Sequence, residues 1–164
     1  MPNLQTFTCR NALKLGTIDL ASVPNLNTLD VAGATLLKDT LDLTYSTNLA
    51  ILDISGLSFD TLDVIAPCKD TLAILKVNDT NITTISPNEY TTLYRLECRN
   101  TQITGFSAND STLEYVDISG NTLLTQVNVE ETTAVKTVIV TGTTLTEGSF
   151  PNWDNSYMTL VNEG

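Results

Sequence analysis

The chain of 164 residues contains no histidine, one tryptophan and only three cysteines. Histidine is the commonest general base and metal ligand, so its absence excludes a Ser-His or Cys-His nucleophile. Three cysteines are too few and too scattered to indicate a disulfide framework. No phosphate-binding loop or dinucleotide fingerprint is present. We therefore expect a protein that is not an enzyme, with no catalytic residue, no metal site and no cofactor.

Positive charge is also scarce, because eight basic residues face nineteen acidic ones and the net charge is −11. Nucleic acids and anionic membrane surfaces both need a basic partner, so neither is expected to bind. No apolar run approaches the roughly eighteen residues of a membrane span. The first ten residues, MPNLQTFTCR, do not form a signal peptide. The compartment therefore stays open. We expect the cytoplasm or a virion if Met1 is a natural start, and the extracellular space or the cell surface if the chain is a fragment of a secreted precursor.

What the sequence has instead is one short apolar phrase, repeated every ten to thirteen residues. The phrase is an apolar residue, two others, an apolar residue, one other, and a last apolar residue. The regular copies begin at Leu4, Leu26, Leu49, Leu72, Leu93, Leu113 and Val135, and weaker copies stand between them. Self-similarity at a fixed short period is the signature of a stacked repeat architecture.

Each copy ends in apolar alternation of period two and is too short for a helix, which predicts a strand. β-Branched residues fill the gaps between the apolar positions, and turn formers such as Asn11, Gly33, Gly56, Asn100 and Gly142 separate the copies. We therefore predict a coil with two short strands per turn, stacked about 4.8 Å apart into parallel sheets. The regular copies would form one sheet, called the first face, and the weaker copies a second face.

Aligned on the regular copies, the repeat is 20 to 23 residues long and resembles a leucine-rich repeat, LxxLxLxxNxL, over residues 3 to about 146. The aligned segments are LNTLDVAGATL, LAILDISGLSF, LAILKVNDTNI, LYRLECRNTQI, LEYVDISGNTL and VKTVIVTGTTL. The likeness is greatest to the short bacterial class in which both halves carry LxxLxL. The sequence departs from it at the asparagine slot, which only Asn121 fills, so a generic two-sided β-solenoid is the alternative.

The expected fold is thus a β-rich, leucine-rich-repeat-like solenoid of about seven coils with little or no α-helix. We assign residues 1–146 to the solenoid and 147–164 to a C-terminal aromatic cap, in which Phe150, Trp153, Tyr157 and Met158 would cover the last coil. No cap precedes Leu4, so the first coil would offer an open edge to self-association or to a partner chain. Inward-pointing Cys9 and Cys98 would be small core residues, and Cys68 a free thiol in a loop.

The outward side chains of the first face fall into three predicted rows. Row 1 is Thr6, Thr28, Ile51, Ile74, Arg95, Tyr115 and Thr137; row 2 is Thr8, Asp30, Asp53, Lys76, Glu97, Asp117 and Ile139; row 3 is Arg10, Ala32, Ser55, Asn78, Arg99, Ser119 and Thr141. Exposed apolar, tyrosine and arginine side chains on a rigid sheet are typical of an interaction hot spot. The candidate binding residues are Ile51, Ile74, Lys76, Arg95, Glu97, Arg99, Tyr115 and Asp117. The alternative is a cross-strand charge ladder worth roughly 0.2–1 kcal/mol per pair.

The second face carries two weaker candidate arrays. Asp19, Asp42 and Asp63 occupy equivalent outward slots, which would suit calcium or simply form a solvated acidic ladder. Thr17, Thr40, Thr61 and Thr84 are in register two residues earlier, and a flat threonine array of this kind resembles an ice-binding surface. Threonine also suits any exposed strand position.

The leading hypothesis is a non-enzymatic recognition module that binds a protein or a surface glycan through the first face, the usual binding surface of leucine-rich repeats. A structural subunit of a larger assembly, such as a bacterial surface layer or a phage particle, is the alternative, and ice binding is a distant third.

Overall fold

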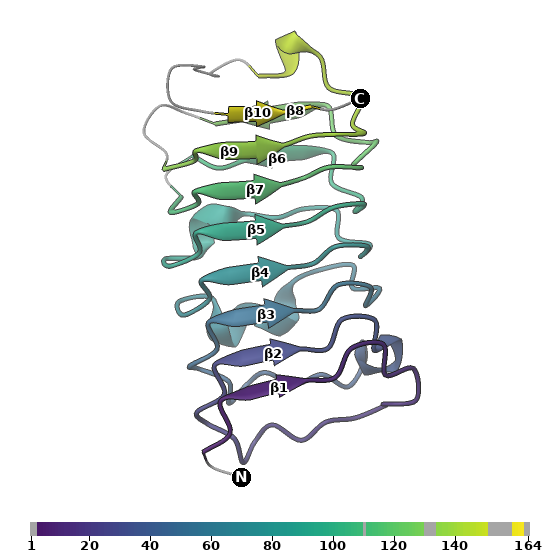
Figure 1. The fold of residues 1–164 in the computed structure, drawn as a ribbon, viewed down its shortest axis with the longest axis vertical. Helices are drawn as coiled ribbons and strands as arrows, with labels where there is room; N and C mark the ends of the chain where they lie inside the picture. The colour runs from purple at the N-terminus through teal and green to yellow at the C-terminus, as the bar shows by residue number, and fades with distance from the viewer. Residues whose placement is uncertain (1–2, 110, 130–133, 151–158, 163–164) are drawn as a thin grey trace.

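The computed structural model describes residues 3–109, 111–129, 134–150 and 159–162, which form a single elongated stack of coils (Figure 1). Eight strands, one from each successive turn, make one parallel sheet in the order β1-β2-β3-β4-β5-β7-β9-β10. They are β1 (Thr6–Thr8), β2 (Thr28–Asp30), β3 (Ile51–Asp53), β4 (Ile74–Lys76), β5 (Arg95–Glu97), β7 (Tyr115–Asp117), β9 (Thr137–Ile139) and β10 (Thr159–Val161). This sheet is the predicted first face, and the β-solenoid predicted from the repeat is confirmed.

The register of the first face is the one that the repeat predicts. In row 1, Ile51 pairs with Ile74, Ile74 with Arg95, and Arg95 with Tyr115. Row 2 pairs Lys76 with Glu97 in the same way. Because side chains of a strand alternate between its two faces, this register directs the middle residue of each strand into the core and its row 1 and row 2 residues to the outer side of the sheet.

The second face differs from the prediction of two strands per turn. Among the described residues it has a strand in two turns only, β6 (Gly105–Ser107) and β8 (Gln126–Asn128), which pair with each other. Earlier turns carry 3-10 helices or irregular chain at this position. The 3-10 helices of the described residues are η1 (Thr35–Leu37), η2 (Asp63–Cys68), η3 (Pro87–Glu89) and, near the C-terminus, η4 (Glu147–Ser149). Pro67 lies inside η2 and Pro87 begins η3, and proline cannot donate a ladder hydrogen bond.

The core is the column of apolar side chains between the two faces. The middle residues of the strands, such as Leu52, Leu75 and Leu96, are completely buried, and apolar side chains from the second half of each turn pack against them with somewhat more exposure. Cys98 is buried as predicted. Cys68 is a free thiol, as predicted, but it ends η2 rather than lying in a loop, and it is completely buried, where its thiol donates to the Ile65 carbonyl over 3.3 Å. Burial raises the pKa of Cys68 to about 11.

Each turn leaves the first face through one residue in the left-handed conformation. These residues have φ between 52° and 74° and are Asn11, Gly33, Gly56, Asp79, Asn100, Gly120 and Gly142. They stack directly on one another, since an added Cβ at Gly33 would collide with the side chain of Asn11, and one at Gly120 with that of Asn100. Glycine and asparagine tolerate this conformation, which explains the turn formers at these positions.

The asparagine slot is filled in one turn, and there it acts as expected for the repeat. Asn121 is completely buried, and its amide makes four hydrogen bonds. The carbonyl oxygen accepts from the backbone N–H and the hydroxyl of Thr101, at 2.7 and 2.6 Å. The amide nitrogen donates to the carbonyls of Cys98 and Ile118, at 2.9 and 2.7 Å. Asn121 therefore ties its own turn to the preceding one.

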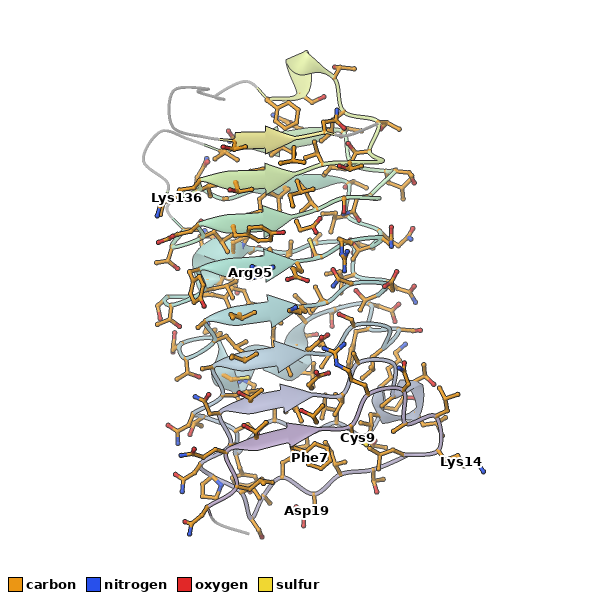
Figure 2. All side chains as sticks on the ribbon, in the orientation of Figure 1. Phe7, Cys9, Lys14, Asp19, Arg95 and Lys136 are labelled. Carbon is orange, nitrogen blue, oxygen red and sulfur yellow. The ribbon has the colours of Figure 1, made fainter. Side chains whose placement is uncertain are left out.

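The two ends of the stack differ from its middle. At the N-terminal end, Phe7 and Leu4 are only partly buried, whereas Leu29 and Leu26 of the next turn are completely buried (Figure 2 shows Phe7 and Cys9 at this end). At the C-terminal end, β10 lies within the segment predicted to be a cap and adds a strand to β9. Phe150 packs against the core. Trp153, Tyr157 and Met158 lie outside the described residues, so the aromatic cap remains a prediction.

Candidate functional site

The first face carries a charge balance unlike that of the rest of the chain. Its three rows hold four of the eight basic residues and four of the nineteen acidic ones, so they are electrically neutral. The remainder of the sequence, with four basic and fifteen acidic residues, carries the whole net charge of −11. All three arginines of the chain, Arg10, Arg95 and Arg99, belong to these rows. The first face is thus a neutral surface on a strongly acidic protein.

At the centre of this face, two cations share one carboxylate. Arg95 contacts Oε1 of Glu97 through Nε at 2.9 Å and through Nη2 at 2.8 Å. Lys76, from the preceding turn, places Nζ 3.2 Å from the same oxygen. Burial by itself would raise the pKa of Glu97, whose side chain is only 8% exposed, but the hydrogen bonds and charges of Arg95 and Lys76 together lower it. Glu97 is therefore ionised at neutral pH, and the cluster Lys76–Glu97–Arg95 has a formal net charge of +1.

Arg95 also stacks on an aromatic ring, and it lies over the middle of the sheet in Figure 2. Its guanidinium carbon is 4.1 Å from the centre of the Tyr115 ring on the next strand. Such a cation–π contact is worth about 0.5–1 kcal/mol at a partly exposed site. Burial, and after it the negative charge of Asp117, raises the pKa of Tyr115, so the phenol remains a neutral hydrogen-bond donor. Stacking and ion pairing fix the position of Arg95 before any partner arrives.

Tyr94 extends this surface, and the sequence reasoning missed it. It comes just before β5 and is 46% exposed, one of five large apolar or aromatic side chains that are exposed in the described part of the chain. Its carbonyl accepts the backbone N–H groups of Glu114 and Tyr115, so it lies at the edge of the first face beside the next turn. The sequence shows it as a tyrosine directly before Arg95 that belongs to none of the three rows. The phrase-based alignment assigned that slot to no face.

The acidic residues of row 2 have a structural role that the sequence reasoning did not anticipate. In Asp53 and Asp117, Oδ1 accepts the backbone N–H two residues later, that of Ser55 or Ser119, at 3.1 Å in both cases. The second oxygen then faces an arginine from another turn. Oδ2 of Asp53 lies 2.8 Å from Arg10. Asp53 and Asp117 therefore stabilise the corners of their own turns, and their oxygens already have partners within the chain.

Of the predicted binding residues, the structure brings six into direct pairwise contact. Lys76, Arg95 and Glu97 form the central cluster, Tyr115 lies under Arg95, and Arg99 is 3.7 Å from Asp117. The remaining two, Ile51 and Ile74, are neighbours in row 1 and half-buried. Of the predicted charge ladder, the pair of Lys76 with Glu97 forms, whereas Asp53 pairs with Arg10. That this surface binds a partner stays a prediction. We call this surface, together with Tyr94, the central patch.

The two arrays predicted on the second face do not form flat ladders. Thr17, Thr40, Thr61 and Thr84 lie on no strand, so the regular sheet that an ice-binding array needs is missing at those positions. Asp19 and Asp42 each accept the backbone N–H two residues later, and Asp63 accepts the hydroxyl of Thr61 at 2.8 Å. Within the described residues, no group of three or more acidic or cysteine side chains could hold a metal ion.

Comparison with solved structures finds the same fold in a bacterial protein. A structure described as the functional domain of InlJ from Listeria monocytogenes, including a cysteine ladder, superimposes with a TM-score of 0.72 and 18% sequence identity over 98% of this chain. This chain spans 39% of that one. The chain described here has two cysteines in equivalent slots, Cys9 and Cys98, with Val31, Ile54 and Val77 in the turns between them.

No family model matches the sequence, and no curated protein matches it. Among the described residues, no helix has both the length and the apolar character that crossing a membrane requires. The leucine-rich-repeat-like fold therefore rests on the structure and on its likeness to the InlJ domain.

Proposed function

We propose that the chain is a non-enzymatic recognition module that binds a protein partner through the central patch of the first face. The observation that carries this proposal is the neutral, arginine-bearing surface on an otherwise acidic protein. The residues outside the first face carry the whole net charge of −11, whereas the central patch carries one net positive charge beside the exposed ring of Tyr94 and the half-buried ring of Tyr115. Charge complementarity of this kind directs encounter and orientation more than it adds affinity.

The chemistry of the patch fits a protein rather than a small ligand. Tyrosine and arginine dominate the energetics of protein–protein interfaces, and Tyr94, Arg95 and Tyr115 lie together on neighbouring strands. Rigid side chains lose little conformational freedom on binding, and Arg95 is already held by Glu97 and Tyr115. The likeness to the InlJ domain supports the fold of such a module.

The experiment is an affinity capture from the extract or surface fraction of the source cells with immobilised protein. The variant Arg95→Glu with Tyr115→Ala removes the centre of the patch. Lys38→Glu is the matched control, because it makes the same charge change at an exposed ion pair with Asp60, outside the first face. We expect a partner that binds the wild type and the control and is lost with the double variant. A partner whose measured dissociation constant is the same for all three would refute the assignment.

A second candidate is an assembly subunit, and the half-exposed core of the first coil favours it. Leu4, Phe7, Leu15 and Ile18 pack only partly, and the outer edge of β1 is paired with no other described strand. A coil from a second copy of the chain would bury these side chains and pair this edge. Light scattering after size exclusion tests this candidate: a mass that rises with concentration supports it, and a constant monomer mass counts against it.

A further inference from the structure

The second face contains two cavities that meet along one segment. The first, of about 290 Å³, lies between η2 and η3, and the second, of about 470 Å³, lies beside β6 and β8. Thr84, Ile85 and Ser86 line both. The two cavities therefore adjoin along this segment, at the change from 3-10 helices to strands, and together we call them the groove. The groove is on the opposite side of the solenoid from the central patch.

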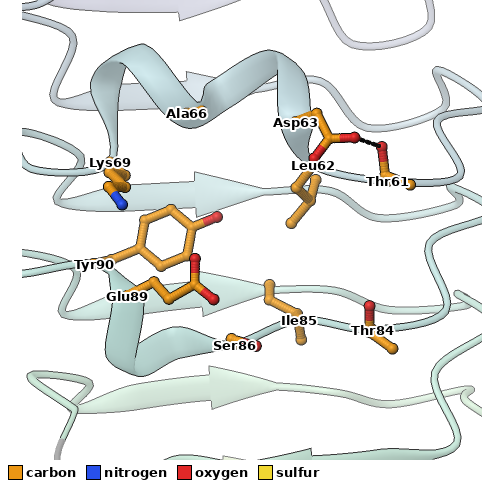
Figure 3. Close-up of a pocket in the computed structure, with 10 residues that line it drawn as sticks. All are labelled: Thr61, Leu62, Asp63, Ala66, Lys69, Thr84, Ile85, Ser86, Glu89 and Tyr90. Atoms are coloured by element: carbon orange, nitrogen blue, oxygen red, sulfur yellow. Dashed lines mark hydrogen bonds between the residues drawn. The ribbon is translucent and has the colours of Figure 1, made fainter.

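The first cavity contains the hydroxyl of Tyr90, which is free to bind a ligand. Tyr90 is only 8% exposed, and Figure 3 shows its ring between η2 and η3 with the hydroxyl directed into the cavity. No described residue forms a hydrogen bond with that hydroxyl. The hydroxyl is open to the cavity, so it can donate a hydrogen bond to a ligand that lies there. Burial, and then the charge of Glu89, raises the pKa of Tyr90, which keeps the phenol a donor.

The other walls of the first cavity mix acceptors, a donor and apolar surface. Asp63 and Glu89 supply carboxylate oxygens, Lys69 supplies an ammonium group, and Leu62 and Ile85 supply apolar contact. Figure 3 shows these side chains around one space, with Asp63 held by the hydroxyl of Thr61. A simple cation would meet Lys69, and an anion would meet two carboxylates. The walls instead fit a neutral ligand that has hydroxyl groups around an apolar ring face.

The second cavity continues the same chemistry without charge. Its walls are hydroxyl and amide side chains, among them Thr104, Ser107 and Gln126, with Phe106 as apolar surface. Gly105 is exposed on β6, and an added Cβ there would meet no atom within 4 Å. The space above Gly105 is therefore open to a flat ligand. A groove with one charged and one uncharged half suits neither a metal ion nor a phosphate chain.

We propose that this groove binds a neutral oligosaccharide, with one sugar ring in the cavity at Tyr90 and the next ring over Gly105. The Tyr90 hydroxyl would donate to a sugar oxygen, while Asp63 and Glu89 would accept from sugar hydroxyls. The volume of the first cavity is close to the lower limit for small-ligand pockets, which suits a single ring. This site is separate from the central patch, and it does not depend on the proposed protein partner.

The test is an NMR titration of the whole chain with a panel of neutral sugars: glucose, galactose and N-acetylglucosamine, then maltose, lactose and diacetylchitobiose. We expect at least one disaccharide to bind more tightly than its monosaccharide and to shift amides of residues 61–69, 83–90 and 104–107. Tyr90→Phe removes only the hydroxyl. It should raise the dissociation constants of the monosaccharide and of the disaccharide about fivefold, which corresponds to the loss of roughly one hydrogen bond. Tyr94→Phe, on the first face, is the matched control and should bind like the wild type.

Gly105→Tyr fills the second half of the groove without disturbing the backbone. It should abolish the preference for the disaccharide and leave monosaccharide binding intact, and it keeps the test decisive if Tyr90→Phe does not fold. Arg95→Glu should leave sugar binding unchanged, which separates this site from the central patch. The proposal is wrong if no sugar of the panel binds, if the shifts map outside the groove, or if Tyr90→Phe and Gly105→Tyr both bind like the wild type.

Discussion

The buried amide of Asn121 gives the sharpest prediction for stability. Asn121→Ala removes four hydrogen bonds and leaves the backbone N–H and hydroxyl of Thr101 and the carbonyls of Cys98 and Ile118 without their partner. Each hydrogen bond contributes about 1 kcal/mol net, and unpaired buried groups cost more. We therefore expect the free energy of unfolding to fall by about 3–5 kcal/mol, which is a large fraction of the stability of a single domain.

A graded series checks the reasoning. Thr80 occupies the same slot in an earlier turn and donates one hydrogen bond, to Val77 over 2.8 Å. Thr80→Val should therefore cost about 1 kcal/mol, and Asn121→Thr, which can retain one of four bonds, should fall between the two. Urea unfolding followed by circular dichroism measures all three, and an unchanged slope against urea shows that the transition itself is the same. If Asn121→Ala costs no more than Thr80→Val, the four hydrogen bonds do not stabilise the stack as described.

Three further predictions concern the corner, the central patch and the thiols. Gly120→Ala should lower the free energy of unfolding by more than about 1 kcal/mol, because φ is +69° and the added Cβ meets the preceding turn. Gly16→Ala is the control: its φ is ordinary and the space around it is open, so it should lower the free energy of unfolding by less than about 0.5 kcal/mol. Glu97→Gln should cost about 1–2 kcal/mol at pH 7, measured by urea unfolding. Since the folded pKa of Glu97 is lowered, its contribution is complete above the ordinary carboxyl pKa and is lost as the pH falls below it, so the difference between variant and wild type should shrink in acid. In the native protein a thiol reagent at pH 8 should modify Cys9 alone, because Cys98 is buried with a raised pKa; rapid reaction of all three thiols would contradict the packing.

The first face could be predicted residue by residue because its geometry leaves no choice. A strand alternates its side chains between two sides, and in a stack of coils the apolar side must face the core. Once the phrase was aligned, the pairs Ile74 with Arg95 and Lys76 with Glu97 followed. The same logic placed Cys98 inside.

The second face could not be predicted in this way, because the same apolar pattern is compatible there with several backbone conformations. Ile65 and Cys68 reach the core from a 3-10 helix as readily as alternating residues do from a strand. The apolar pattern constrains which side chains are inside but not the path between them. Cys68 was misplaced for this reason.

Composition and register predicted which residues of the site share a row, but not which side chains contact each other. They brought Arg95 and Tyr115 to the same row, but the orientation of each side chain depends on neighbours that no alignment shows. The sharing of Glu97 by two cations, the bracing of the corners by Asp53 and Asp117, and the exposure of Tyr94 all arise from rotamers. The groove at Tyr90 forms where residues 61–69 and 84–90 meet, and the repeat pattern does not show that these two segments enclose a cavity.

The division between a fixed first face and a variable second half determines where this chain can accept new sequence. Equivalent strand residues are 23 apart from Thr28 to Ile51 and only 20 apart from Arg95 to Tyr115, yet the ladder stays in register. Differences in length are thus absorbed behind the sheet, in the 3-10 helices and irregular chain. Loops grafted there would lengthen a turn without displacing any row residue, whereas a single residue inserted into a strand would move every side chain after it in that strand to the opposite side.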